Sequence, residues 1–208
     1  MAGLYFFFVS TYLQIATKFG HIGLAVAAIG FFSASLWGWI GSKIGKHRVL
    51  AICNLSIVLS LIAMGLIRPG ENAFYALLTI FSLSSLFTAG STVGYYALMG
   101  DIVDYDELKT GSNKAGNYYA LITLFQKIGL GAGAGIGLLI TSLFGFDPNG
   151  ANEGTALFGF FAAFIGIPIL LNLSAMVLAW IFPITERRHQ IIRKRLDARA
   201  ARAAAAGV

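Results

Sequence analysis

The sequence predicts an all-α membrane protein that crosses the bilayer several times. Only 12% of its 208 residues are charged, against roughly 25% in a typical soluble domain, and 57% are hydrophobic. The mean hydropathy of +0.76 leaves too few polar side chains to cover a soluble core of this size. The 25 Gly and 17 Phe indicate helices that approach one another closely in lipid. The same composition excludes intrinsic disorder and a coiled coil.

Six runs with few or no charges are candidates for membrane-spanning helices, because about 20 apolar residues cross the hydrocarbon core as a helix. The first run is short, and the last three are long enough to tilt or to extend past the hydrocarbon. The predicted spans are 2–16, 22–40, 49–67, 73–99, 116–146 and 155–184. Residues 1–185 therefore form the predicted membrane domain, and residues 186–208 form a basic tail.

The basic residues gather on one side of this topology. Most of the 15 Lys and Arg lie in the segments 42–48 and 100–115 and in the tail, whereas Lys18 and Arg68 lie on the opposite side. Because cytoplasmic loops retain positive charge, we expect both termini in the cytoplasm. We expect the tail to contact anionic membrane lipid as an amphipathic helix, or to remain a solvated chain. Nucleic acid is not an expected partner, and the single cysteine, Cys53, excludes an intrachain disulfide and a cysteine-based metal cluster.

Lys127 is the only charged residue inside the six predicted spans. Counted from Gly116 at 1.5 Å per residue, it lies roughly 16 Å along its helix, close to the bilayer midplane. A charge at this depth is costly unless it faces a cavity or a counter-ion. No span contains an acidic residue that could pair with it. We therefore predict that Lys127 lines a functional site and is neutralised by substrate, water or another polypeptide, with a structural ion pair as the alternative.

Other polar and aromatic side chains are predicted near Lys127. Thr123 and Tyr119 share its helix face at i−4 and i−8, and Gln126 lies beside it. Hydroxyl, amide and ammonium groups in an apolar wall suit a polyhydroxylated ligand. Two tyrosines near the end of the preceding span could add an aromatic platform or anchor the helix at the membrane interface. The candidate substrate-binding residues are Lys127, Thr123, Gln126, Tyr119, Tyr95 and Tyr96.

Three glycines follow Lys127 at intervals of four residues. The spacing of Gly129, Gly133 and Gly137 favours a smooth helix face for close helix packing. The run formally satisfies a relaxed dinucleotide-binding pattern, but no predicted strand precedes it. Packing is therefore the predicted role.

The acidic segment 101–111 is predicted to be a loop at the cytoplasmic membrane boundary. Its carboxylates are Asp101, Asp104, Asp106 and Glu107. Four carboxylates could hold a divalent metal in a membrane enzyme, form switchable ion pairs, or be solvated. The segment alone leaves the three roles open.

Two motifs resemble a known family of transporters. The segment 36–48, LWGWIGSKIGKHR, is similar to the G-x-x-x-D-R-x-G-R-R loop of the major facilitator superfamily, although Ser42 stands where an aspartate is usual. The pattern D-I-V-D-Y-x-E-x-K-x-G at 101–111, followed by a span that carries a lysine, resembles the glycoside–pentoside–hexuronide:cation symporters. The resemblance covers nearly the whole chain.

The resemblance implies the C-terminal six-helix half of a twelve-helix transporter in a bacterial cytoplasmic membrane, starting within the seventh helix. Such a transporter carries a sugar or related glycoside by alternating access, coupled to H⁺ or Na⁺ and with no other cofactor. Lys127 matches the lysine of the family's sugar and cation region, and Thr123 matches a threonine of its sugar site. Thr92 and Ile122 stand where some members carry an aromatic residue and a glutamine, which leaves the particular sugar open.

The resemblance also implies a partner and a gate. The carboxylates that bind the coupling ion belong to the N-terminal six-helix half, so that half, in the same gene or on another chain, is the expected partner, and this chain alone is expected to be inactive. The candidate cytoplasmic gate residues are Asp101, Asp104, Tyr105, Glu107, Lys109, Lys43, Lys46 and Arg48. The rival functions are a non-transporting remnant or assembly partner and, more remotely, a metal-dependent membrane enzyme; no enzymatic activity is expected.

Overall fold

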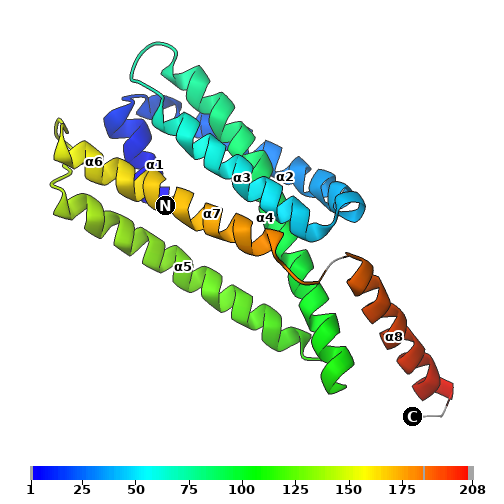
Figure 1. Cartoon of the computed structure of the whole chain (residues 1–208). Helices are drawn as coiled ribbons and strands as arrows, with labels where there is room; N and C mark the ends of the chain where they lie inside the picture. Colours follow the sequence, from blue (N-terminus) through cyan, green and yellow to red (C-terminus); the bar gives the residue numbers. More distant parts are fainter. Residues whose placement is uncertain (1, 185, 206–208) are drawn as a thin grey trace.

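The computed structural model describes residues 2–184 and 186–205, and within these ranges the chain is helical apart from short connections (Figure 1). The predicted boundary at residue 185 and the last three residues of the predicted tail lie outside the described residues. The elements are α1 (Ala2–Phe7), η1 (Phe8–Tyr12), η2 (Ala16–Lys18), α2 (Phe19–Ile44), α3 (Lys46–Gly65), α4 (Ala73–Thr110), α5 (Ala115–Leu143), α6 (Thr155–Phe161), η3 (Ala162–Gly166), α7 (Ile167–Trp180) and α8 (Glu186–Ala205).

Five helices among the described residues are long and apolar enough to cross a membrane. They correspond to the predicted spans from the second to the sixth, and the last of them runs continuously through α6, η3 and α7 as Thr155–Trp180. The first predicted span is α1 followed by the π-helical turn η1, which ends at Tyr12 and is short for a complete crossing. The prediction of an all-α polytopic membrane fold is confirmed.

The acidic segment is helical, and this corrects the predicted loop. Instead of ending at Met99, α4 continues through Thr110. Residues 101–110 contain no proline or glycine that would interrupt the helix. The charged residues of this segment therefore mark the membrane boundary, and the helix continues past them. The helix ends at Gly111, which has a φ of +76° and donates its N–H to the carbonyl oxygen of Glu107. The connection to α5 is therefore only the segment 111–114.

Aromatic side chains of η1, α6, η3 and the connection between α5 and α6 build much of the larger core cluster. The Phe8 ring lies 5.2 Å from Phe164, and Phe146 stacks on Phe160 at 4.7 Å between ring centroids. Phe8 and Phe160 are fully buried, together with Leu77 of α4. These contacts hold the short first segment against the last span.

The helices α2, α3 and α4 cross closely at Gly90. A methyl group at Gly90 would lie 2.6 Å from the Cys53 sulfur and 2.7 Å from the Trp37 ring. Trp37 donates its indole N–H to the carbonyl oxygen of Leu86 at 2.9 Å, which fixes the ring at the crossing. Only a residue without a side chain fits between these three helices.

The predicted glycine face of α5 behaves differently. Gly137 packs against α1, because a methyl group there would lie 2.8 Å from Leu4. Gly129 and Gly133 have nothing within 4 Å of the corresponding position among the described residues. α5 contacts α1, α4, α6 and η3, lies at the edge of the bundle, and leaves most of its side chains exposed (Figure 1). Helix packing at these two glycines stays a prediction, because no described helix contacts them.

Candidate functional site

Three of the predicted site residues meet where α4 crosses α5. Tyr96 donates its hydroxyl to the Gln126 side-chain oxygen at 3.1 Å, and Gln126 donates its side-chain N–H to the Tyr95 hydroxyl. The two tyrosine rings lie 4.5 Å apart between centroids. Both hydroxyls are therefore bound to an amide of the next helix, which favours the aromatic platform over interface anchoring.

Tyr119 extends this cluster along α5. Its ring stacks on Tyr96 at 6.3 Å between centroids, with an angle of 27° between the planes. Its backbone carbonyl accepts a hydrogen bond from the Thr123 hydroxyl at 2.9 Å. The Thr123 oxygen therefore keeps its acceptor lone pairs for another partner. Tyr119, Thr123 and Gln126 are all exposed, so they form a wall that is open on one side.

Lys127 lies next to this wall and is exposed as well. In the part of the chain that the structure describes, its ammonium has no hydrogen bond and no ion pair. The predicted anionic or polar partner of Lys127 is thus supplied neither by α4 nor by any other described helix. A role in binding substrate stays a prediction.

A second cluster joins the first turn of α3, the C-terminal part of α4 and the start of α8. The Lys46 ammonium lies 2.5 Å from the Asp101 carboxylate, and His189 lies 3.3 Å from the same carboxylate. His189 also lies 2.8 Å from Asp104, which is 3.2 Å from the Arg193 guanidinium. Asp101 is only 2% exposed. A buried carboxylate needs such cationic partners, because an unpaired charge in this position is strongly destabilising.

The remaining gate candidates do not join this cluster. Lys43 lies 3.9 Å above the Trp39 ring, and Lys109 lies 4.9 Å above Tyr105 on its own helix. Glu107 accepts a hydrogen bond from the Asn113 side chain at 2.9 Å. Arg48 is exposed and has no ion pair with any described residue. Of the eight predicted gate residues, the structure brings together Lys46, Asp101 and Asp104.

The sequence did not single out the two tail residues that complete the cluster. His189 and Arg193 are one helical turn apart and share a face of α8 with Ile192, which is buried, and Leu196. Arg199 follows on this face and lies over Gly111, since a methyl group there would be 2.8 Å from its guanidinium. The carbonyl groups at the end of α4 carry partial negative charge, which favours a guanidinium in this place. The tail is therefore a helix that packs on α4 rather than a solvated chain.

The carboxylates of the acidic segment do not converge on one point. Asp106 pairs with Lys114 at 3.6 Å, while Asp101 and Asp104 face α3 and α8. Within the described ranges, no group of three or more His, Cys, Asp or Glu is placed to hold a metal ion. The arrangement fits the ion-pair role better than the metal-enzyme role.

These features define a polytopic helical membrane protein with a polar wall on two helices and an ion-paired cluster that joins α3, α4 and α8. The family described as MFS/sugar transport protein matches residues 1–186, and the chain belongs to this family. The resemblance predicted from the two motifs is thereby confirmed.

Curated relatives of the chain are named as transporters. It is 29% identical over 189 residues to the uncharacterized symporter sll1374 of Synechocystis, an alignment that covers 86% of this chain and 34% of the relative. It is 25% identical over 158 residues to the isoprimeverose transporter of Lactiplantibacillus pentosus, covering 74% and 32%. It is 29% identical over 104 residues to the glucuronide carrier protein homolog of Escherichia coli, covering 50% and 23%. The chain thus spans about a third or less of each relative's length.

Proposed function

We propose that this chain forms one wall of the substrate pathway in a cation-coupled symporter for a sugar or a related glycoside. The observation that carries the proposal is the wall of Tyr95, Tyr96 and Gln126, with Thr123 beside it and with Lys127, which has no ion pair among the described residues. Aromatic rings and an amide bind the faces and hydroxyls of a sugar, and a hydroxyl and an ammonium extend the same surface. The names of two relatives, the isoprimeverose transporter and the glucuronide carrier protein homolog, support the same substrate class.

The open side of the wall indicates that a second set of helices faces it. Alternating access requires two bundles that rock around a site near the bilayer midplane. Two observations support a second six-helix half with acidic residues facing this wall. The face of α5 at Gly129 and Gly133 is open, and no described residue pairs with the Lys127 ammonium. Those residues would bind the coupling H⁺ or Na⁺. We place both bundles in the bacterial cytoplasmic membrane, with both termini of this chain in the cytoplasm.

The ion-paired cluster suits a gate on the cytoplasmic side. Opening a path to the cytoplasm between α3, α4 and α8 would separate Lys46 from Asp101 and His189 from Asp104. Each pair favours the closed arrangement, and binding of substrate has to offset that preference. Transport rather than catalysis is the function that this arrangement supports. A non-transporting remnant or assembly partner is the second candidate.

The direct test is uptake of labelled sugars by vesicles. The chain is tested alone, and as the C-terminal part of a chimera with the first six helices of the Synechocystis symporter. A panel of neutral glycosides and glycuronides is offered with a Na⁺ gradient, an H⁺ gradient or neither. We expect gradient-driven uptake by the chimera and none by the chain alone. Uptake by the chain alone would contradict the two-bundle proposal, and a folded chimera that transports no sugar would favour the remnant.

A further inference from the structure

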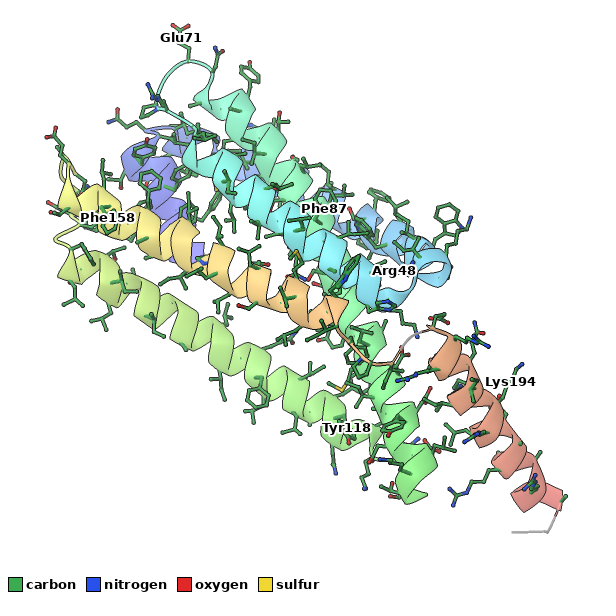
Figure 2. The ribbon with its side chains drawn as sticks, in the orientation of Figure 1. Arg48, Glu71, Phe87, Tyr118, Phe158 and Lys194 are labelled. Carbon is green, nitrogen blue, oxygen red and sulfur yellow. The ribbon has the colours of Figure 1, made fainter. Side chains whose placement is uncertain are left out.

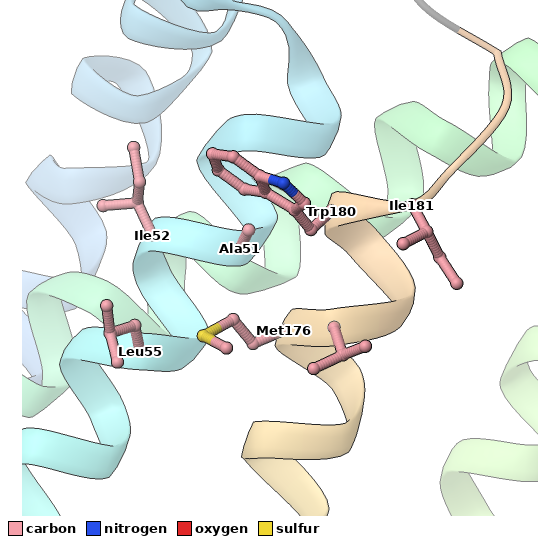
Figure 3. Close-up of a pocket in the computed structure, with 7 residues that line it drawn as sticks. Ala51, Ile52, Leu55, Met176, Trp180 and Ile181 are labelled. Carbon is pink, nitrogen blue, oxygen red and sulfur yellow. The ribbon is translucent and has the colours of Figure 1, made fainter.

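A groove lies between α3 and α7, whereas the polar wall lies on α4 and α5 (Figure 3). It has a volume of about 310 Å³. The side chains that line it are Ala51, Ile52, Leu55, Met176, Val177, Trp180 and Ile181. All of these are apolar apart from the indole N–H of Trp180. Such walls offer no polar partner to a sugar or an ion. A hydrocarbon chain would make apolar contacts along all of them.

The groove lies at the cytoplasmic end of the spans. It begins one turn after Lys46, the residue that joins the ion-paired cluster, and it ends where α7 ends at Trp180. Trp180 is 67% exposed, as is typical of a tryptophan at the level of the lipid headgroups. Trp39, with Lys43 above its ring, lies at the same end of α2. The groove therefore opens where the acyl chains meet the headgroups.

Two guanidinium groups flank the mouth of this groove. Arg48, Ile52 and Leu55 are spaced i, i+4 and i+7 and share one face of α3, so Arg48 lies one turn beyond the apolar lining (Figure 2). Arg188 donates to the carbonyl oxygen of Pro183 at 2.9 Å, which holds its guanidinium at the connection that follows α7. Both arginines are exposed, and neither forms an ion pair with another residue that the structure describes.

One acidic residue lies in the same region. Glu186, at the start of α8, is close enough to His47 to act on it electrostatically, as is Arg48. Glu186 can offset part of the positive charge of the two arginines. The charge in this region remains positive, since Arg187 follows Glu186 in the first turn of α8.

We propose that the α3–α7 groove is a binding site for an anionic phospholipid. One acyl chain lies against Leu55, Met176 and Val177, and the headgroup phosphate lies between Arg48 and Arg188. Basic residues at the cytoplasmic end of a groove between helices provide the charge complementarity for such a lipid. This inference does not depend on transport, because it concerns a different face of the bundle from Gln126 and Lys127.

The test uses Trp180 as a reporter that is already part of the site. The chain is reconstituted in phosphatidylcholine vesicles containing an equal fraction of brominated phosphatidylglycerol or brominated phosphatidylcholine. Bromine quenches tryptophan on contact, and subtracting the signal of Trp180→Phe isolates Trp180 from Trp37 and Trp39. We expect phosphatidylglycerol to bind the groove more tightly, by roughly fivefold in affinity for each guanidinium that contacts the phosphate, and its brominated form therefore to quench Trp180 more strongly.

Two pairs of variants separate the groove from the rest of the surface. Arg48→Gln with Arg188→Gln removes the lipid preference, whereas Lys194→Gln with Arg195→Gln, which changes exposed charges elsewhere on α8, retains it. Val177→Phe fills the groove and reduces quenching, whereas Leu170→Phe on the same helix, outside the groove, does not. Folding of each variant is checked by circular dichroism and gel filtration.

Three results would overturn the proposal. Equal quenching by the two brominated lipids in the unmodified chain would remove its basis. A preference that survives Arg48→Gln with Arg188→Gln would show that these two cations are not responsible. A preference lost in Lys194→Gln with Arg195→Gln would assign the effect to the basic surface of α8.

Discussion

Lys46 lies 2.5 Å from Asp101, and this contact ties the first turn of α3 to α4 at a buried carboxylate. The pair lies beside His189, so a single carboxylate connects three helices. This end of the bundle is therefore held by charge, whereas packed aromatic rings hold its other end.

Asp101→Asn should destabilise the protein markedly. The amide keeps the shape of the carboxylate but removes the negative charge that Lys46 and His189 share. Because Lys46 is partly exposed, water screens part of the loss, and we expect a cost of about 1–3 kcal/mol. Thermal unfolding in detergent measures it. Asp197→Asn, at an exposed position of α8, is the matched control and should leave the midpoint unchanged.

His189→Ala combined with Arg193→Ala should release α8 from α4. These substitutions remove both tail partners of Asp104, and the helix keeps its contacts through Ile192 and through Arg199 at the end of α4. A spin label at Ala198, which is exposed, should become more mobile. High salt should increase the mobility in the unmodified chain as well, because it screens the same pairs. Lys194→Ala is the control, and equal mobility in the control and the double variant would argue against docking by charge.

Gly90→Ala should disrupt the crossing of α2, α3 and α4. The added methyl group would meet Cys53 and Trp37 at distances that atoms do not adopt, so the helices have to separate. Overpacking of this kind costs about 1–3 kcal/mol. Gly129→Ala adds the same methyl group where nothing lies within 4 Å, and its better helix propensity should make it neutral or slightly stabilising. Unfolding curves of the two variants in the same detergent provide the comparison.

The sequence predicted the fold class well because hydropathy is a local property. Five of the six spans correspond to helices that are long and apolar enough to cross a membrane. The end of the fourth span was misplaced, since charge at 101–109 marks the membrane surface while the helix continues until Gly111. Helix termination follows backbone geometry, and a change in polarity alone does not reveal it.

The long-range contacts could not be predicted in the same way. Asp104 and His189 are 85 residues apart in the sequence, and nothing local indicates that the tail returns to α4. The glycine spacing on α5 predicted a packing face but gave no information on which helix would meet it, and it did not point to the close crossing at Gly90. Tyr95, Tyr96 and Gln126 were named as candidates, yet their hydrogen bonds depend on the relative register of two helices.

A further prediction concerns the two hydrogen bonds that Gln126 of α5 forms with Tyr95 and Tyr96 of α4. Gln126→Leu keeps the size of the side chain and removes both hydrogen bonds to the tyrosines. We expect weaker sugar binding by roughly tenfold, as for the loss of an oriented polar contact. Thr88→Val, which removes an exposed hydroxyl of α4 that bonds its own helix, is the control. Isothermal calorimetry with the chimera measures the affinity.

Sugar uptake by the Lys127→Gln chimera tests the central claim most directly. Lys127 is exposed, has no partner among the described residues and lies beside Gln126. If its ammonium serves the substrate or coupling-ion site, gradient-driven uptake should fall at least about tenfold, because a charge-assisted contact is lost. Lys194→Gln, which removes the same charge from the exposed side of α8, should transport normally. Full uptake by the Lys127→Gln chimera, at normal expression, would contradict the account.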